Sequence, residues 1–123
     1  MFRVIRWTVQ RPLQLQGAHH DTIVWVDAIK LDAAWKRDKA YHIGPYVSGP
    51  GNGSRHKYQR FGCWVLNNRR KVRMPYVSYR RGAVSFTDGR HRFAWMRDRG
   101  ERALPVIASC REAPTIARLF GTR

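Results

Sequence analysis

Apolar and polar positions alternate or recur with a short period along most of the chain, which predicts several short elements. Phe2 to Val9 alternates as an edge strand does, and the alternation ends at Arg11-Pro12. The apolar run Ile23 to Val26 predicts a second strand. Asp27 follows as a candidate helix N-cap, and apolar positions at helical spacing continue to Trp35, so this strand leads into a helix.

A glycine-rich segment, residues 44–54, precedes a helix predicted from Arg55 to Leu66. Helical spacing places Tyr58, Phe61 and Val65 on one face of this helix. The basic side chains able to line another face are Arg55, Lys57 and Arg60. The glycine-rich segment lacks the ending of a Walker loop and the spacing of a dinucleotide fold, so a phosphate-cradling loop and a plain linker both stay open.

The second half of the chain predicts a hairpin, a strand and a final helix. Residues 74–79 and 83–86 flank a short turn, as the two arms of a β-hairpin do. Residues 104–108 form a further apolar run, and the last helix begins with Pro114 and stops before Gly121. The order of elements predicts an α+β fold with a mixed sheet and short helices.

Length and charge define the class of protein. A chain of 123 residues suffices for one core and is too short for two, so we expect a single domain over residues 1–123. A net charge of +16 on a chain with ordinary hydrophobic content predicts a folded protein that binds polyanions.

Cys63 and Cys110 form no C-x-x-C pair, which argues against a zinc or redox role. No apolar run reaches the roughly eighteen residues that span a bilayer, so we expect a cytoplasmic protein without membrane contact.

The positive charge is concentrated in a basic belt, residues 39–87, which contains no Asp or Glu. Its candidate nucleic-acid-binding residues are Arg55, Lys57, Arg60, Arg69, Arg70, Lys71 and Arg73. Aromatic residues interleave with them, as expected where phosphates are neutralised and unstacked bases meet rings. Periodicity assigns Phe61, Trp64 and Val65 to the core. The remaining stacking candidates are Tyr41, Tyr46, Tyr58, Tyr76 and Tyr79. An acidic protein surface would require the same charge and stays open.

The most distinctive segment is Asp88-Gly89-Arg90-His91-Arg92, between an apolar run and a helix predicted over Phe93 to Arg99, which Gly100 ends. A strand that turns through glycine into a helix leaves the first backbone N–H groups pointing outward, where they favour an anion. Arginine adds a planar fork suited to phosphate, and histidine can donate, accept or transfer a proton. The alternative is an Asp88 N-cap with a solvated basic turn, although cations oppose the helix dipole there.

The strand, hairpin, D-G-R-H-R turn, helix and A-L-P-V strand resemble the ParB/sulfiredoxin superfamily, over roughly Val24 to Ala108. In ParB-like proteins the corresponding turn is G-E-R-R and contacts nucleotide phosphates. In sulfiredoxins it is G-G-C-H-R, and its cysteine is the reactive group. Gly89, His91 and Arg92 match the sulfiredoxin pattern. Arg90 stands where the cysteine would be, which argues against sulfinic-acid repair.

Within that superfamily the chain is most similar to plasmid fertility inhibition factors of the Osa and FiwA type. The resemblance covers most of the chain and is carried by the glycine-rich loop and by the segments VDAIKLDAAW, KYQRFGCW, RMPYV and VSFTDGRHRFAWMRDRGERALPV. It implies a ParB/sulfiredoxin-like fold in a protein of mobile elements that suppresses conjugative transfer or type IV secretion of DNA. ATP-dependent DNA cleavage is described for the fold type. For this chain the resemblance implies nucleotide or DNA phosphate bound by Gly89, Arg90, His91 and Arg92, with Asp88 nearby.

Two hypotheses follow. In the first, the protein is an enzyme that acts on DNA with ATP or another nucleotide: Arg90 and Arg92 clamp phosphate, and Asp88 or His91 is catalytic, handling a proton or Mg²⁺. Because carboxylates are few, Asp27 and Asp32 would have to approach the turn in the fold. In the second, the protein is a non-catalytic basic inhibitor that binds DNA or a component of the conjugative or type IV secretion machinery, or that inhibits another host nucleic-acid system.

Overall fold

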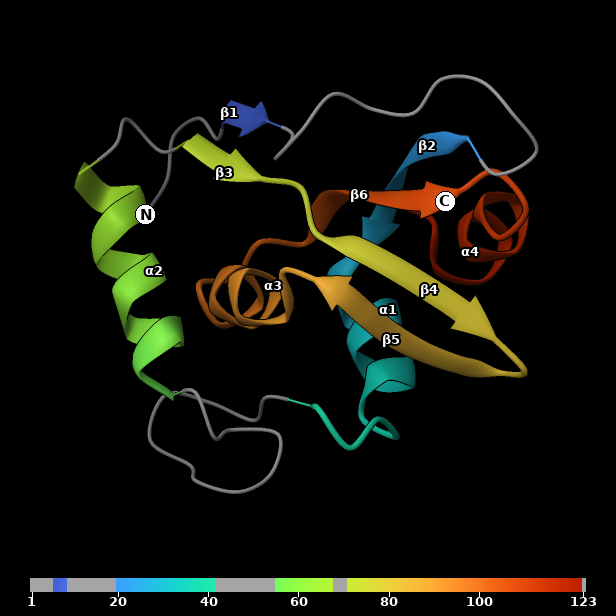
Figure 1. Ribbon diagram of the computed structural model, residues 1–123, viewed down its shortest axis with the longest axis horizontal. Coiled ribbons are helices and arrows are strands. Elements are labelled where there is room, and N and C mark those ends of the chain that lie inside the picture. Colours follow the sequence, from blue (N-terminus) through green and yellow to red (C-terminus); the bar gives the residue numbers. More distant parts are fainter. Residues whose placement is uncertain (1–5, 9–19, 42–54, 68–70, 123) are drawn as a thin grey trace.

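The computed structural model describes residues 6–8, 20–41, 55–67 and 71–122, which form six strands and four helices (Figure 1). In chain order these elements are β1 (Arg6–Thr8), β2 (Asp21–Asp27), α1 (Ala28–Trp35), α2 (Arg55–Asn67), β3 (Lys71–Arg73), β4 (Tyr76–Arg80), β5 (Ala83–Asp88), α3 (Arg90–Asp98), β6 (Ala103–Ser109) and α4 (Ala113–Phe120). The predicted hairpin is β4–β5, and the predicted strand and helix after α3 are β6 and α4.

Four of the strands form a mixed sheet in the order β2-β6-β4-β5. The outer pairs β2/β6 and β4/β5 are antiparallel, whereas β4 and β6 are parallel. The short strand β1 pairs in parallel with β3 in a separate two-stranded sheet. This architecture confirms the predicted α+β class with a mixed sheet and short helices.

With the exception of Ile107, the buried apolar residues in the described part of the chain form one hydrophobic cluster. In β2, Val24 and Val26 are buried while Ile23 and Trp25 are exposed, the alternation expected of an edge strand with one face on the core. The interior strand β6 is buried continuously over residues 104–108. No helix in the described part of the chain is long and apolar enough to cross a membrane.

The sequence signals for the start of α1 and α4 are confirmed. Asp27 caps α1, because its Oδ1 accepts hydrogen bonds from the backbone N–H of Ile29 (2.9 Å) and Lys30 (3.2 Å). In α4, Pro114 lies in the first turn, where its missing N–H costs nothing. Of the strand predicted over Phe2 to Val9, Arg6–Thr8 is β1 and the rest lies outside the described residues.

Helices α2 and α3 lie side by side (Figure 1). Gly62 permits this close approach, since a Cβ there would lie 2.3 Å from Nε1 of Trp95. The Phe61 ring meets the Trp95 ring edge to face, with centroids 5.5 Å apart. Tyr58 and Val65 are buried on the same packed side of α2. The packing of α2 on α3 therefore determines which side chains of α2 remain accessible.

Candidate phosphate-binding cleft

A cleft of about 670 Å³ joins α2 to the turn between β5 and α3. We call it the basic cleft; its lining residues are Lys57, Arg60, Phe61, Trp64, Arg73, Phe86, Thr87, Asp88, Gly89, Arg90, His91 and Arg92. The packing of α2 on α3 thus brings two cations of the basic belt, Lys57 and Arg60, to the Asp88–Arg92 turn, and a third, Arg73, reaches it from β3. The sequence singled out the belt and the turn separately and gave no signal that they meet.

Gly89 is the residue that lets the chain pass from β5 into α3. It is the N-cap of α3 and has left-handed backbone angles, φ 88° and ψ 18°. A Cβ at this position would also lie 2.9 Å from Cα of Pro75. The alternative that Asp88 is the N-cap is wrong: Asp88 is the last residue of β5, and no side chain bonds at the cap. The first backbone N–H groups of α3 therefore begin directly at the basic cleft.

Arg92 links the Asp88–Arg92 turn to the neighbouring strand β3. Its Nη2 donates to Oδ2 of Asp88 at 2.9 Å, and its Nε donates to the carbonyl oxygen of Arg73 at 3.1 Å. Its side chain is only 17% exposed. Arg92 therefore ties the ends of β3 and β5 to the first turn of α3. The phosphate contact predicted for Arg92 stays a prediction. It would use the guanidinium N–H groups that take no part in these two hydrogen bonds.

The other cations of the basic cleft come from three elements. Lys57 and Arg60 lie on α2, Arg73 ends β3, and Arg90 begins α3. Among the residues that the structure describes, the side chains of these four make no ion pair or hydrogen bond. Neighbouring cations without counter-charges create a positive potential that attracts anions.

Not every member of the predicted nucleic-acid-binding set can be placed. Arg55 and Lys71 belong to α2 and β3 by their backbone, and their side chains lie outside the described part. Arg69, Arg70 and the glycine-rich segment 44–54 also lie outside it. Their predicted roles stay predictions.

Two assignments of aromatic residues on α2 were wrong. Trp64, assigned to the core, is 41% exposed and lines the basic cleft. Tyr58, a stacking candidate, is buried, and its hydroxyl donates to Oδ2 of Asp98 at 2.6 Å. Both errors have one cause, because the face of α2 that packs on α3 carries Tyr58 and Gly62, which leaves Trp64 on the adjoining face.

The other tyrosine candidates that the structure describes lie outside the basic cleft. Tyr41 packs edge to face on Trp35, with centroids 4.8 Å apart. Tyr79 packs in the same way on Phe120, and the Tyr76 hydroxyl donates to Asp21. Tyr46 lies outside the described residues. These described rings therefore serve packing and hydrogen bonding within the fold.

The described side chains do not fit a protein-held Mg²⁺ at the turn. Asp27 and Asp32, which the enzyme hypothesis would require at the turn, have other roles: Asp27 caps α1, and Asp32 binds Arg97. Within the cleft lining, Asp88 is the single carboxylate and already accepts from Arg92. Groups of three or more His, Cys, Asp or Glu side chains that could hold a metal are absent from the described residues. We therefore derive no step through a metal held by these residues.

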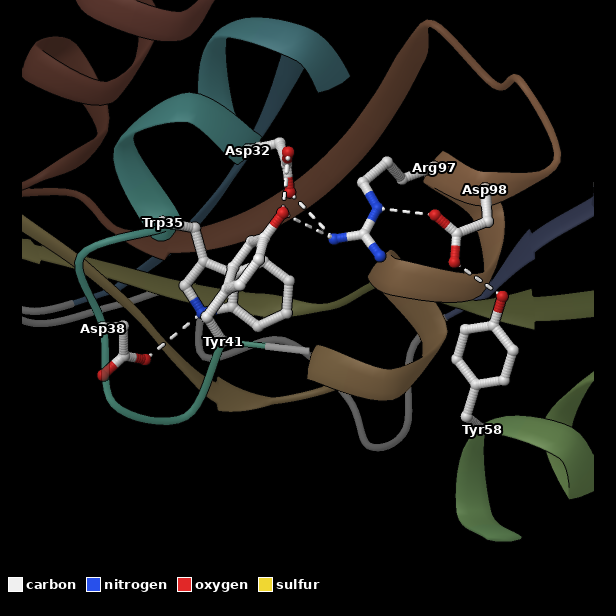
Figure 2. Close-up of polar contacts among 7 residues, drawn as sticks. All are labelled: Asp32, Trp35, Asp38, Tyr41, Tyr58, Arg97 and Asp98. Carbon is white, nitrogen blue, oxygen red and sulfur yellow. Dashed lines mark hydrogen bonds and ion pairs between the residues drawn. The ribbon is translucent and has the colours of Figure 1, made fainter. Parts of the chain in front are cut away.

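A second polar cluster, not expected from the sequence, joins α1, α2 and α3 (Figure 2). Arg97 lies at its centre and is only 12% exposed. Its Nη1 donates to Oδ1 of Asp32 at 2.9 Å, and its Nε donates to Oδ1 of Asp98 at 2.8 Å. The Tyr41 hydroxyl donates to Asp32 Oδ2 at 3.1 Å, and the Tyr58 hydroxyl bonds Asp98. We call these five residues the Arg97 cluster.

Burial and charge shift the pKa values within the Arg97 cluster. Burial raises the pKa of Tyr41 to about 12, and Asp32 adds to this rise while Arg97 opposes it. Burial, followed by the hydrogen bond to Asp98, also raises the pKa of Tyr58. For Arg97, burial lowers the pKa, but its bonds to Asp98 and Asp32 outweigh burial and raise it. The cluster thus holds its arginine charged and its phenols neutral.

Comparison with solved structures first places the protein in a fold class. The chain is similar to the crystal structure of Oncogenic Suppression Activity Protein, described as a plasmid fertility inhibition factor and solved as a gold(I) cyanide derivative. The TM-score is 0.57 at 18% sequence identity, over 91% of this chain and 68% of that chain. At this identity the likeness shows a shared α+β fold.

The family follows from the sequence itself. The model of the plasmid fertility inhibition factor family matches residues 23–121, which includes the whole basic cleft. The chain therefore belongs to the plasmid fertility inhibition factor family. Comparison with curated proteins gives no match.

Proposed function

We propose that this fertility inhibition factor works by binding the phosphates of DNA or of a nucleotide in the basic cleft. The observation that carries the proposal is the convergence of Lys57, Arg60, Arg73 and Arg90, from three separate elements, on the first turn of α3. Suppression of conjugative or type IV secretion transfer would then follow from occupation of the DNA or nucleotide that transfer requires.

The charge balance of the cleft supports a polyanionic ligand. Five of its lining side chains are Lys or Arg, whereas Asp88 supplies its one carboxylate among the described residues and is paired with Arg92. Guanidinium forks match phosphate oxygens bidentately, and the start of a helix adds backbone donors to the same anion. Each phosphate that such a surface neutralises releases condensed counterions, which makes binding strong at low salt.

Binding to a protein of the transfer machinery is the rival use of this surface. An acidic protein would meet the same cations, but it presents separate carboxylates rather than a continuous row of phosphates. The cations also gather around the first turn of α3, where the backbone N–H groups of a helix start favour a phosphate. We therefore place DNA or nucleotide first among the partners.

Phosphoryl-transfer chemistry is the second candidate, because Asp88 and His91 line the same cleft as the phosphate-binding cations. His91 would move a proton, and the arginines would stabilise charge on the phosphoryl oxygens. DNA incubated with the protein, with and without ATP and Mg²⁺, should be examined on denaturing gels. Cleavage that His91→Gln abolishes while oligonucleotide binding persists would add catalysis to the proposal.

The binding proposal is tested with a double variant, Arg60→Ala/Arg90→Ala. We expect it to bind a fluorescently labelled single-stranded oligonucleotide at least roughly tenfold more weakly at moderate salt. The slope of log K against log salt should fall by about 1.4, because each phosphate contact on a single strand contributes about 0.7.

The matched control is Arg80→Ala/Arg81→Ala at the tip of the β4–β5 hairpin, which removes the same charge from exposed positions outside the cleft. It should change affinity by less than about threefold, the effect of net charge alone. Equal loss in the two double variants would mean that binding is spread over the whole basic surface, and the cleft proposal would fail.

A further inference from the structure

We propose that the ligand of the basic cleft is a nucleotide with an unpaired base, and that the base stacks on Trp64. The inference rests on the proposed function and extends it from phosphate to base. It identifies the accessible substrate class as single-stranded nucleic acid or a free nucleotide, whose bases can leave the stack, and not as intact duplex.

The first support is the arrangement of residues along α2. Lys57, Arg60, Phe61 and Trp64 recur at helical spacing and all line the basic cleft. Seven residues of helix advance about 10 Å, so a cation and a ring lie along the cleft within about three nucleotide steps of ~3.4 Å. The same helix face can therefore hold a backbone phosphate near Lys57 or Arg60 and a base near Trp64.

The second support is that the Trp64 ring is held in place before any ligand arrives. It stacks on Phe61 with an interplanar angle of 21° and centroids 6.4 Å apart. Phe61 in turn meets Trp95, which is buried and packs against Gly62. A ring fixed through this series to α3 loses little side-chain entropy on binding, which favours stacking.

The third support is that Trp64 is exposed to solvent. Trp64 is 41% exposed although it belongs to a cleft, so a large apolar residue faces water beside several cations. Base stacking on such a ring is favourable for every base, since each base has a π-face. Trp25 is equally large and 50% exposed, but it lies on β2 and does not line the cleft, which makes it the matched control.

The experiment compares three labelled ligands of equal length: a single-stranded oligothymidine, an abasic strand with the same phosphates, and a duplex. Binding is measured for the wild-type protein, Trp64→Leu, Trp64→Phe and Trp25→Leu. Wild type should bind the oligothymidine more tightly than the abasic strand. Trp64→Leu should weaken oligothymidine binding roughly tenfold and leave abasic binding unchanged. Trp64→Phe should restore most of the loss, and Trp25→Leu should resemble wild type.

The outcomes separate the two proposals. If wild type binds oligothymidine and abasic strand alike, or if Trp64→Leu weakens both equally, the stacking inference is overturned while phosphate binding stands. If none of the ligands binds in a salt-dependent way, the proposed function fails and the inference fails with it. Displacement of the oligothymidine by thymidine monophosphate would support stacking with a free nucleotide as ligand. Displacement by oligonucleotides alone would support stacking with a single strand.

Discussion

The two ends of α3 carry arginines in opposite settings. At its start, Arg90 lines the basic cleft and makes no ion pair among the described residues. At its end, Arg97 is 12% exposed and bonds two carboxylates (Figure 2). One residue type on one helix therefore cross-links the interior at one end and faces an open cleft at the other. What differs is where the acidic side chains lie.

The chain has eight acidic residues, and seven of them have bonding partners within the fold. These seven are Asp21, Asp27, Asp32, Asp38, Asp88, Asp98 and Glu112. Carboxylates thus cap α1, bond neighbouring elements and neutralise Arg97, and just one of the seven lines the basic cleft. Internal pairing of the acids leaves the cleft cations available for an external anion.

The largest effect should come from breaking the Arg97 cluster. Arg97→Met removes the common partner of Asp32 and Asp98, so two largely buried carboxylates lose their counter-charge. We expect the free energy of unfolding to fall by about 3 kcal/mol, as when one partner of a buried pair is removed. Urea denaturation measures this loss.

Arg80→Met is the control for that substitution. Arg80 also pairs with a carboxylate, Glu112, but its side chain is 79% exposed. Its replacement should cost less than about 1 kcal/mol, because water screens an exposed pair. Similar losses for the two variants would contradict the distinction between a buried cluster and a surface pair.

A smaller effect on stability, combined with an effect on binding, is expected at Gly89. Gly89 and Gly100 share the same left-handed φ of 88°, but a Cβ would meet Pro75 at the first position and open space at the second. Gly100→Ala should therefore cost about 1 kcal/mol from backbone strain alone. Gly89→Ala should cost more and should also weaken oligonucleotide binding, because the turn that forms the cleft must shift. Equal stability losses with unchanged binding would show that the turn does not shape the site.

Local signals in the sequence predicted most of the elements. The Asp27 cap, the β4–β5 hairpin and the Pro114 start of α4 depend on residues a few positions apart, and each is confirmed. The Arg97 cluster could not be predicted in this way, since Arg97 and Asp32 are 65 residues apart. Its partners are revealed only when α1, α2 and α3 pack together.

The candidate site was predicted in pieces. The Asp88–Arg92 turn and the basic residues were each singled out, but the meeting of Lys57 and Arg60 with the turn depends on the contact between Gly62 and Trp95. Arg73 joins them from β3, whose end Arg92 ties to the turn. The contact between Gly62 and Trp95 also explains why Trp64 faces the cleft although periodicity alone favours the core. Sequence periodicity identifies a helix face, and tertiary packing decides whether that face meets protein or ligand.

The most direct test of the difference between the two ends of α3 is a nuclear magnetic resonance titration. A single-stranded oligothymidine is added to isotopically labelled protein, and the side-chain N–H signals of the arginines are followed. We expect the Nε–H signals of Arg60 and Arg90 to shift with the bound fraction, while that of Arg97 stays in place because Asp98 already accepts from its Nε. Shifts confined to arginines outside the basic cleft, such as Arg80, would contradict the assignment of the cleft as the phosphate-binding site.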